Sequence, residues 1–223
     1  MAAGRGERMR PLTDTLPKPL APLAGKPLIV YHLEALARAG ILDVVINLSW
    51  LGSQISAALG DGARYGVRIR YSDEGPQPLE AGGIFKALPL LGPDPFLVVN
   101  SDIWTDVDFG HLALDRDADA RLVLVNNPPH IPRGDFGLEG DWVLEREVDR
   151  FTYSGVGVYR PEFFAGCSPG KFQLLPLLKR AIAARRLRGE LYQGEWYELG
   201  TLSLLAELDA RLRARLAAAR ERA

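Results

Sequence analysis

The stretch that decides the fold class is the run Phe96-Leu97-Val98-Val99-Asn100, which is followed by Ser101 and Asp102. The run is almost entirely apolar and does not alternate with polar residues, which is typical of a strand that is covered on both faces. It follows residues 82–91, whose apolar residues have helical spacing. A helix that leads into a buried strand indicates an α/β sheet, so we expect Asp102 at the carboxyl end of a strand, where such sheets bind ligands.

The same alternation continues through the first half of the chain. It predicts a Rossmann-like, mostly parallel sheet with right-handed crossovers and helices on both faces. The expected helices cover residues 27–39, 51–59 and 82–91, and the expected strands cover residues 43–48, 67–71 and 96–100.

The second half has a different pattern, with short strands at hairpin spacing. We expect a small antiparallel excursion from the main sheet. Its strands are predicted at residues 120–126, 136–139, 142–145 and 151–160, followed by a helix at 173–186, a last strand within 194–200 and a terminal helix from residue 202.

Composition excludes several classes of protein. The 223 residues carry 27 Lys+Arg and 28 Asp+Glu, and this balance argues against a nucleic-acid partner. The single cysteine, Cys167, excludes an internal disulfide and fits a reducing compartment. No apolar run approaches the ~18 residues of a membrane span, and no secretory signal is present. We therefore expect a single-domain cytoplasmic protein over residues 1–223, without a membrane partner and monomeric.

The densest functional signal is the glycine loop, residues 4–10, which reads Gly-Arg-Gly-Glu-Arg-Met-Arg. It lacks the third glycine of a dinucleotide-binding fingerprint and the Gly-Lys-Ser/Thr of a P-loop. A flexible backbone beside cations is nevertheless a natural cradle for phosphate, with Arg8 as a forked donor. Lys18 stands between Pro17 and Pro19, which fix its approach to the same site.

These motifs resemble the signature of the sugar-1-phosphate nucleotidyltransferases. The resemblance begins with Ala2-Ala3-Gly4-Arg5-Gly6-Glu7-Arg8-Met9-Arg10-Pro11-Leu12-Thr13, Pro17-Lys18-Pro19-Leu20 and Gly25-Lys26-Pro27-Leu28-Ile29. It continues with the base-binding loop Pro78-Leu79-Glu80-Ala81-Gly82-Gly83, the metal motif Asn100-Ser101-Asp102 and the run Trp196-Tyr197-Glu198-Leu199-Gly200-Thr201. The base-binding loop is one residue shorter than in relatives, and Glu198 stands where most relatives carry Asp.

The resemblance implies the nucleotide-diphospho-sugar transferase fold. Residues 1–106 would form a nucleotide-binding half, residues 107–201 a sugar-binding half and residues 202–223 a terminal helix. The implied reaction is attack of a sugar-1-phosphate on the α-phosphorus of a nucleoside triphosphate. Residues 134–136 and 151–155 resemble most the members that transfer a uridylyl group from UTP to N-acetylmuramate α-1-phosphate in cell-wall sugar recycling. Guanylyl transfer to mannose-1-phosphate, thymidylyl or uridylyl transfer to glucose-1-phosphate, and a catalytically silent nucleotide-sugar-binding regulator remain alternatives.

The resemblance also assigns roles to individual residues. Arg8 and Lys18 would be catalytic, and Asp102 and Glu198 would hold Mg²⁺. The nucleotide-binding residues would be Ala3, Gly4, Gly6, Glu7, Arg8, Lys18, Glu80, Gly83 and Asn100, and the sugar-binding residues would be Asp135, Thr152 and Gly155. The residues themselves suggest that Asp106 and Asp108 cap the next helix and that His32 is structural.

The glycine loop follows Met1-Ala2-Ala3 directly. Relatives carry a short apolar run before this loop, the first central strand of their sheet. We therefore expect a truncated first strand here, and we favour a start of the true reading frame upstream of Met1.

Overall fold

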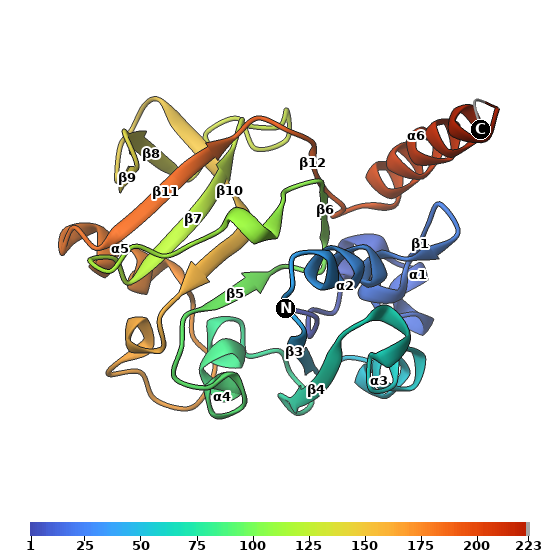
Figure 1. Cartoon of the computed structure of the whole chain (residues 1–223), viewed down its shortest axis with the longest axis horizontal. Coiled ribbons are helices and arrows are strands. Elements are labelled where there is room, and N and C mark those ends of the chain that lie inside the picture. Colours follow the sequence, from blue (N-terminus) through green and yellow to red (C-terminus); the bar gives the residue numbers. More distant parts are fainter. Residues whose placement is uncertain (222–223) are drawn as a thin grey trace. The chain divides into compact units, whose positions relative to one another are not determined.

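The computed structural model describes residues 1–221, which divide into two compact units (Figure 1). The loop unit consists of residues 2–78, 101–105 and those from 197 onward. The barrel unit consists of Met1 and of residues 79–100 and 106–196. The backbone therefore passes between the units several times, and neither unit is one continuous segment.

The loop unit is built around a parallel pair of strands. β3 (Asp43–Leu48) and β4 (Arg68–Asp73) pair over their whole length, and α3 (Gly52–Leu59) connects them. α2 (Leu28–Arg38) packs its apolar face against them, because Ile29, Val30 and Leu33 share one buried core with Ile46 and Ile69. The unit also contains η1 (Glu7–Met9), α1 (Leu12–Thr15), η2 (Lys18–Leu20), β1 (Pro22–Leu23), β2 (Lys26–Pro27), η3 (Ala63–Tyr65) and β6 (Ile103–Thr105), which pairs with β12 (Trp196–Glu198).

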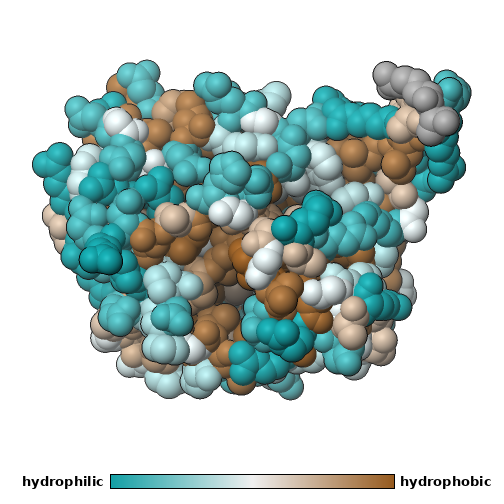
Figure 2. Space-filling model, in the orientation of Figure 1, coloured by the Kyte–Doolittle hydropathy of each residue, from teal (hydrophilic) through white to brown (hydrophobic). Residues whose placement is uncertain are grey.

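α6 (Leu202–Arg220) closes the loop unit. The hydroxyl of Thr201 caps it by accepting a hydrogen bond from the backbone N–H of Leu204. Its leucines Leu205, Leu208 and Leu212 are buried, whereas its arginines are exposed. Figure 2 shows the hydrophilic and hydrophobic residues of α6 on different sides of the helix, as expected for a packed helix with a solvated face.

The barrel unit is built from a closed ring of strands. β10 (Arg150–Tyr159), β7 (Ala120–Val125), β11 (Leu187–Tyr192), β9 (Trp142–Leu144) and β8 (Phe136–Glu139) are neighbours in this order, and β8 pairs back to β10. β5 (Phe96–Val99) joins the outer edge of β10. The unit also contains α4 (Ala81–Leu91), η4 (Phe109–His111), η5 (Pro161–Phe164) and α5 (Leu175–Ala183).

An aromatic cluster fills the core of the barrel unit. Phe96, Tyr159, Phe163 and Phe164 are buried, with ring centroids 5.1 to 6.4 Å apart. Rings at these separations add favourable edge-to-face and offset contacts to the burial of apolar surface. β5 and β10 are therefore held by side-chain packing as well as by their hydrogen bonds.

The strands do not form the single, mostly parallel sheet that the sequence predicts. β5 pairs antiparallel with β10, and within residues 1–221 the parallel pairs are β3–β4 and β7–β11. Residues 1–3 form no strand, and the carbonyl of Val99 in β5 accepts a 2.6 Å hydrogen bond from the amino group of Met1. β5 forms backbone hydrogen bonds with the long apolar strand β10 over its whole length. Because these two strands are far apart in the sequence, the local pattern does not indicate that they pair.

Most other predicted elements are confirmed. Both boundaries lie within two residues of the predicted ones for six elements of the first half, namely α2, α3, α4, β3, β4 and β5. The hairpin β8–β9 forms as expected. β11 was not predicted from the sequence. No helix among the described residues combines the length and apolarity needed to cross a bilayer.

Candidate active site

The glycine loop takes a conformation that requires glycine at one position. Gly6 has φ +69°, in the left-handed region, and its carbonyl accepts hydrogen bonds from the backbone N–H of Met9 (2.9 Å) and the hydroxyl of Thr13 (2.8 Å). A Cβ atom on Gly6 would lie 3.0 Å from Thr13 Cγ2 and 3.3 Å from Lys18 Cβ. The loop therefore packs against the base of the Lys18 side chain, and a larger residue would push the two apart.

The other predicted residues of this loop differ in exposure. Ala3 is buried, and the N–H of the preceding Ala2 donates a 2.6 Å hydrogen bond to Asn47 Oδ1. At Gly4, by contrast, no atom lies within 4 Å of the position a Cβ would take. Glu7 is exposed at the start of η1. The loop is thus anchored at its first residues and open at Gly4, where its backbone can approach a ligand.

Lys18 is a buried cation with one carboxylate partner. It begins η2, and only 7% of its surface is exposed. Its Nζ lies 3.1 Å from Oδ2 of Asp102, whose side chain is 40% exposed. Since an unpaired charge is costly to bury, the ion pair with Asp102 stabilises Lys18 at this buried position.

Arg8 makes the second ion pair of the site. Its Nη2 lies 2.8 Å from Oε1 of Glu198. A Cβ atom on Gly200 would lie 2.7 Å from the same nitrogen, so the guanidinium rests directly on the backbone at this glycine. Only a glycine at position 200 leaves room for this placement.

The two ion pairs are connected through the backbone. The N–H of Leu199 donates a 2.8 Å hydrogen bond to the carbonyl of Asp102, although the two residues are far apart in the sequence. This contact holds Asp102 and Glu198 on neighbouring segments. The loop unit thus brings together both predicted catalytic residues, both predicted metal ligands and the glycine loop.

The carboxylates of Asp102 and Glu198 fit a magnesium ion that is also bound by substrate. Mg²⁺ takes hard oxygen ligands and commonly uses one or two protein carboxylates, with phosphate and water oxygens completing its shell. No cluster of three or more acidic, His or Cys side chains able to hold a metal occurs within residues 1–221. The donor set therefore suits a metal that arrives with phosphates better than a closed structural metal site.

His32 lies behind this site and is buried. Its Nε2 lies 2.9 Å from the carbonyl of Ile103, next to Asp102 in the chain. Burial lowers the pKa of His32 to about 4, because the charged imidazolium would lose its hydration. The ring is therefore neutral at pH 7 and supports β6 through its hydrogen bond, as expected for a structural histidine.

In the barrel unit, the predicted base-binding loop is fixed by the segment 170–172. Glu80 forms a 3.1 Å ion pair with Lys171, and the N–H of Ala81 donates to the carbonyl of Phe172. A Cβ atom on Gly82 would lie 1.9 Å from the carbonyl oxygen of Gly170. The N–H groups of Ala81, Gly82 and Gly83 all donate to backbone carbonyls, so these three amides are already engaged within the protein.

Asn100 and Gly155 meet where β10 bulges. The register of β10 against β7 shifts between Tyr153 and Gly157, and Gly155 has φ +80°. The N–H of Asn100 donates a 2.9 Å hydrogen bond to the carbonyl of Gly155, and a Cβ on Gly155 would lie 2.7 Å from Asn100 Nδ2. A predicted nucleotide-binding residue and a predicted sugar-binding residue are thus in contact.

The other two predicted sugar-binding residues, Asp135 and Thr152, differ in their exposure to solvent. Asp135 is exposed, and its Oδ2 accepts a 2.8 Å hydrogen bond from the N–H of Tyr153. Thr152 is 2% exposed, and its hydroxyl donates to Oδ1 of Asn127. Asp135 is therefore available to a ligand, whereas Thr152 holds the loop that begins at Asn127.

Tyr153, which follows Thr152 in β10, is not a candidate acid or base. Its phenol is buried and hydrogen-bonded to the phenol of Tyr159 at 2.9 Å. Burial raises the pKa of Tyr153 to about 12. Its proton therefore stays in place at neutral pH.

Asp106 and Asp108 were both expected to cap the next helix, and one does. Oδ1 of Asp108 accepts a hydrogen bond from the N–H of Gly110 at the start of η4. Asp106 instead accepts hydrogen bonds from the hydroxyl of Tyr192 (2.5 Å) and the N–H of Glu195 (2.7 Å). It thus ties two distant parts of the barrel unit together, which local spacing does not indicate.

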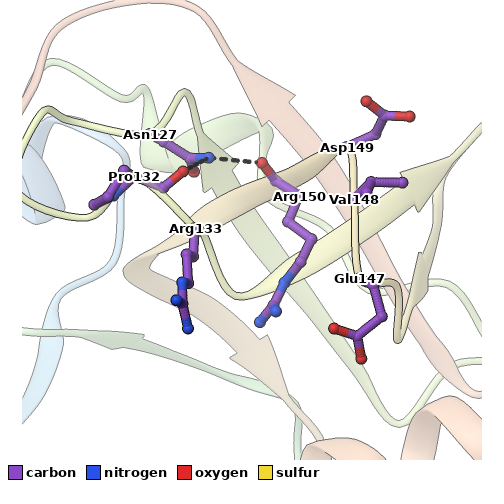
Figure 3. Close-up of a pocket in the computed structure, with 7 residues that line it drawn as sticks. All are labelled: Asn127, Pro132, Arg133, Glu147, Val148, Asp149 and Arg150. Carbon is purple, nitrogen blue, oxygen red and sulfur yellow. Dashed lines mark hydrogen bonds between the residues drawn. The ribbon is translucent and has the colours of Figure 1, made fainter.

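Sequence reasoning missed a pocket at the rim of the barrel (Figure 3). Its volume is about 530 Å³, within the range of ligand pockets. Its lining includes two arginines, Arg133 and Arg150, which the motifs did not single out. Their positions in the sequence could have indicated the pocket. Arg133 lies in the proline-rich loop before Asp135, and Arg150 begins β10. The full lining is Asn127, Pro132, Arg133, Glu147, Val148, Asp149 and Arg150.

Comparisons with known proteins agree with this geometry. The sequence pattern of the Nucleotidyl transferase family matches residues 1–151. The chain is 51% identical to N-acetylmuramate alpha-1-phosphate uridylyltransferase of Neisseria meningitidis serogroup B over 94% of this chain and 95% of that protein. It is 36% identical to the enzyme of the same name from Caulobacter vibrioides, over 95% of each chain.

The fold has counterparts among solved structures. A Bacillus anthracis protein provisionally named a glucose-1-phosphate thymidylyltransferase superposes with a TM-score of 0.83, over 95% of this chain and 93% of that chain, at 19% identity. At this identity the likeness shows the fold alone. The α/β fold, the family pattern and the two relatives agree, and the chain belongs to the nucleotidyl transferase family.

Proposed function

We propose that the protein transfers a uridylyl group from UTP to N-acetylmuramate α-1-phosphate in the cytoplasm, in the recycling of a cell-wall sugar. The observation that carries the proposal is the arrangement in the loop unit, where Arg8 belongs to the glycine loop, Lys18 packs against it, and each of the two pairs with a carboxylate. The identity to two uridylyltransferases over nearly the whole chain supports the choice of substrates.

The reaction requires no covalent enzyme intermediate. An oxygen of the sugar phosphate attacks the α-phosphorus of UTP, and a new P–O bond forms. The bond to the β-phosphate breaks, and pyrophosphate leaves with the electron pair. Two polyanions must meet in this step, so catalysis depends mainly on positioning and on charge stabilisation.

Each cation of the loop unit has a role that fits its surroundings. Arg8 is exposed, and its forked guanidinium suits the leaving phosphates. Lys18 is buried and rigid between prolines, which suits a fixed charge near the α-phosphate. The backbone at Gly4 and Gly6 would cradle the triphosphate between them.

Asp102 and Glu198 would hold Mg²⁺ together with the phosphates. The ion would supply charge neutralisation for the triphosphate and the pyrophosphate. Glu198 has a side chain one methylene longer than the Asp of most relatives. This side chain is mostly buried, and its carboxylate contacts Arg8. Both carboxylates already face a cation, so the ligand-free chain holds no uncompensated charge at either residue.

The barrel unit would supply the remaining contacts. Glu80, Gly83 and Asn100 would contact the nucleotide, and Asp135 and Gly155 would contact the sugar. Thr152, whose hydroxyl is buried, would act by fixing the loop at Asn127.

A substrate panel tests the proposal directly. The protein with Mg²⁺ is assayed for pyrophosphate release with each of the four common NTPs and dTTP, against the 1-phosphates of N-acetylmuramate, N-acetylglucosamine, mannose and glucose. We expect kcat/KM for UTP with N-acetylmuramate α-1-phosphate to exceed every other pair by at least about tenfold. A preference for GTP with mannose-1-phosphate would contradict the substrate assignment, and nucleotide-sugar binding without any turnover would favour a regulatory protein.

A pair of lysine variants tests the site within the same assay. Lys18→Gln removes a charge proposed to act in the transition state, so kcat should fall by about 10² or more. Lys179→Gln is the matched control, since it breaks an exposed 2.9 Å ion pair with Glu145 outside the loop unit and should leave kcat unchanged. Equal activity of the two variants would remove Lys18 from the mechanism.

A further inference from the structure

The rim pocket lies at one end of the barrel, where several strands begin or end. β7 ends at Val125 and β10 begins at Arg150, and the two pair antiparallel. β8 begins at Phe136 opposite Phe151 of β10, so it starts at the same rim. The pocket is therefore lined by the loop between β7 and β8 and by the loop that leads into β10.

The two arginines of this pocket have no carboxylate partner. Arg133 is exposed and makes no hydrogen bond or ion pair within residues 1–221. Arg150 donates from Nε and Nη2 to the backbone carbonyl of Asp135, at 3.1 and 2.7 Å. This fixes the guanidinium of Arg150 while leaving its charge uncompensated, and within the described residues its Nη1 donors have no partner.

Figure 3 shows how these side chains lie. The side chains of Arg133, from the loop between β7 and β8, and of Arg150, at the start of β10, extend in the same direction, and the side chain of Glu147 extends the same way from the loop that leads into β10. The carboxylate of Asp149 points away from both guanidinium groups. Two forked cations therefore open into one cavity, with a single acidic group, Glu147, beside them.

The pocket adjoins a residue that the proposed function assigns to the sugar. Asp135 binds Arg150 through its carbonyl and Tyr153 through its carboxylate. Asn127, which also lines the pocket, donates to the carbonyl of Arg150 at 2.9 Å and binds the hydroxyl of Thr152. One hydrogen-bonded network thus connects the arginines to the expected sugar-binding residues.

We propose that Arg133 and Arg150 form the subsite that recognises the lactyl carboxylate of N-acetylmuramate α-1-phosphate. The proposal rests on the proposed function. The sugar carries two anionic groups, and its lactyl ether places a carboxylate away from the phosphate that reacts. Forked guanidinium groups match the planar carboxylate, and the neutral sugars of related reactions offer nothing for them to bind.

Equilibrium binding tests the subsite without turnover. The full chain is saturated with Mg²⁺ and α,β-methylene UTP, which cannot be cleaved at the α-phosphorus, and titrated calorimetrically with N-acetylmuramate α-1-phosphate. The same titration with N-acetylglucosamine α-1-phosphate, which lacks the lactyl group, measures binding of the rest of the sugar.

Arg133→Gln and Glu147→Gln should change the Kd for the muramate ligand in opposite directions. Arg133→Gln should raise the Kd for the muramate ligand by about tenfold or more and change the Kd for the glucosamine ligand less than about twofold. Glu147→Gln removes a like charge and should lower the Kd for the muramate ligand by about two- to fivefold. Arg146→Gln is the matched control, because Arg146 pairs with Glu139 at 3.6 Å and does not line the pocket, and both Kd values should stay unchanged.

The outcomes separate the subsite from the proposed function. If Arg133→Gln changes both Kd values equally, or neither, while the parent protein turns over N-acetylmuramate α-1-phosphate, the subsite is wrong and the function stands. If the parent protein neither binds this ligand more tightly than the glucosamine ligand nor turns it over, the proposed function is wrong and the subsite falls with it.

Discussion

At the scale of single residues, the loop unit keeps a neutral histidine directly behind a charged site. His32 donates a hydrogen bond from Nε2 to the carbonyl of Ile103, and Ile103 follows Asp102. Because burial holds the pKa of His32 near 4, the folded protein does not take up the proton that the unfolded chain binds near pH 6.5. Lowering the pH from 6.5 toward 4 therefore favours the unfolded state through His32 before most carboxylates titrate.

This difference in pKa predicts how stability depends on pH. Between about pH 6.5 and pH 4 the unfolded state binds more protons than the folded state, so the free energy of unfolding falls as pH falls. The shift corresponds to about 3 kcal/mol, fully present above pH 6.5 and lost progressively down to pH 4. His32→Gln, which can still donate to the carbonyl but does not titrate, should flatten this slope.

Urea unfolding at about pH 7, 5.5 and 4.5 measures the effect in both proteins. Since the carboxylates titrate in both, the difference between the two slopes isolates His32. Parallel slopes would mean that His32 takes up its proton in the folded state.

The residues of the site were predictable to different degrees. Gly6, Arg8 and Lys18 follow from a local run whose glycine and proline spacing is visible in the sequence. The pairing of Asp102 with Lys18 and of Glu198 with Arg8 depends on contacts between residues that lie 84 and 190 positions apart in the sequence. No local pattern encodes such contacts. The resemblance to relatives assigned roles to these four residues but did not predict that they pair.

At the scale of elements, the glycine loop owes its course to one left-handed residue. Gly6→Ala forces a Cβ into a conformation that L-residues avoid and toward Thr13 and Lys18. We expect the free energy of unfolding to fall by roughly 1 to 2 kcal/mol. Gly4→Ala should stay within roughly 0.5 kcal/mol of the parent, since its Cβ meets no atom within 4 Å.

Denaturant unfolding of the ligand-free proteins compares these two variants on equal terms. They lie two positions apart in one loop and carry the same change. If both were equally stable, the conformation of Gly6 would not constrain the loop.

The element that sequence reasoning missed shows where local patterns fail. β11 alternates Leu187, Gly189 and Leu191 with polar residues, which is a strand pattern. It directly follows α5 and the turn at Arg185, so its first residues are easily taken as the end of that helix. Its partners β7 and β9 lie far back in the chain, and the barrel closes only through them.

At the scale of the whole molecule, the last element supports the first loop. Leu205, Leu208 and Leu212 of α6 share a buried core with Met9, which is fully buried at the end of η1. Removing a buried leucine typically costs about 2 to 5 kcal/mol, and the total stability of a domain is about 5 to 15 kcal/mol. The loop unit therefore depends on a helix that makes no predicted contact with substrate.

Two truncations test this dependence. A chain that ends after residue 201 loses all three leucines, and we expect it to lose both its cooperative thermal transition and its turnover. A chain that ends after Ala214 keeps them and should melt within a few degrees of the parent. An unchanged melting temperature in the shorter chain would show that α6 is dispensable to the loop unit.

The interleaving of the two units has a consequence for synthesis on the ribosome. The glycine loop, α2 and the β3–β4 pair emerge first, yet Glu198 and the leucines of α6 emerge last. At roughly 5 to 20 residues per second, the 190 residues that separate Glu198 from Arg8 take roughly 10 to 40 s to add. Until then Met9 lacks the leucines of α6 that will cover it, and Arg8 lacks the carboxylate of its partner Glu198. The nascent chain therefore carries the glycine loop before the residues that complete its surroundings exist, and a ribosome stalled before residue 198 would leave Arg8 without Glu198.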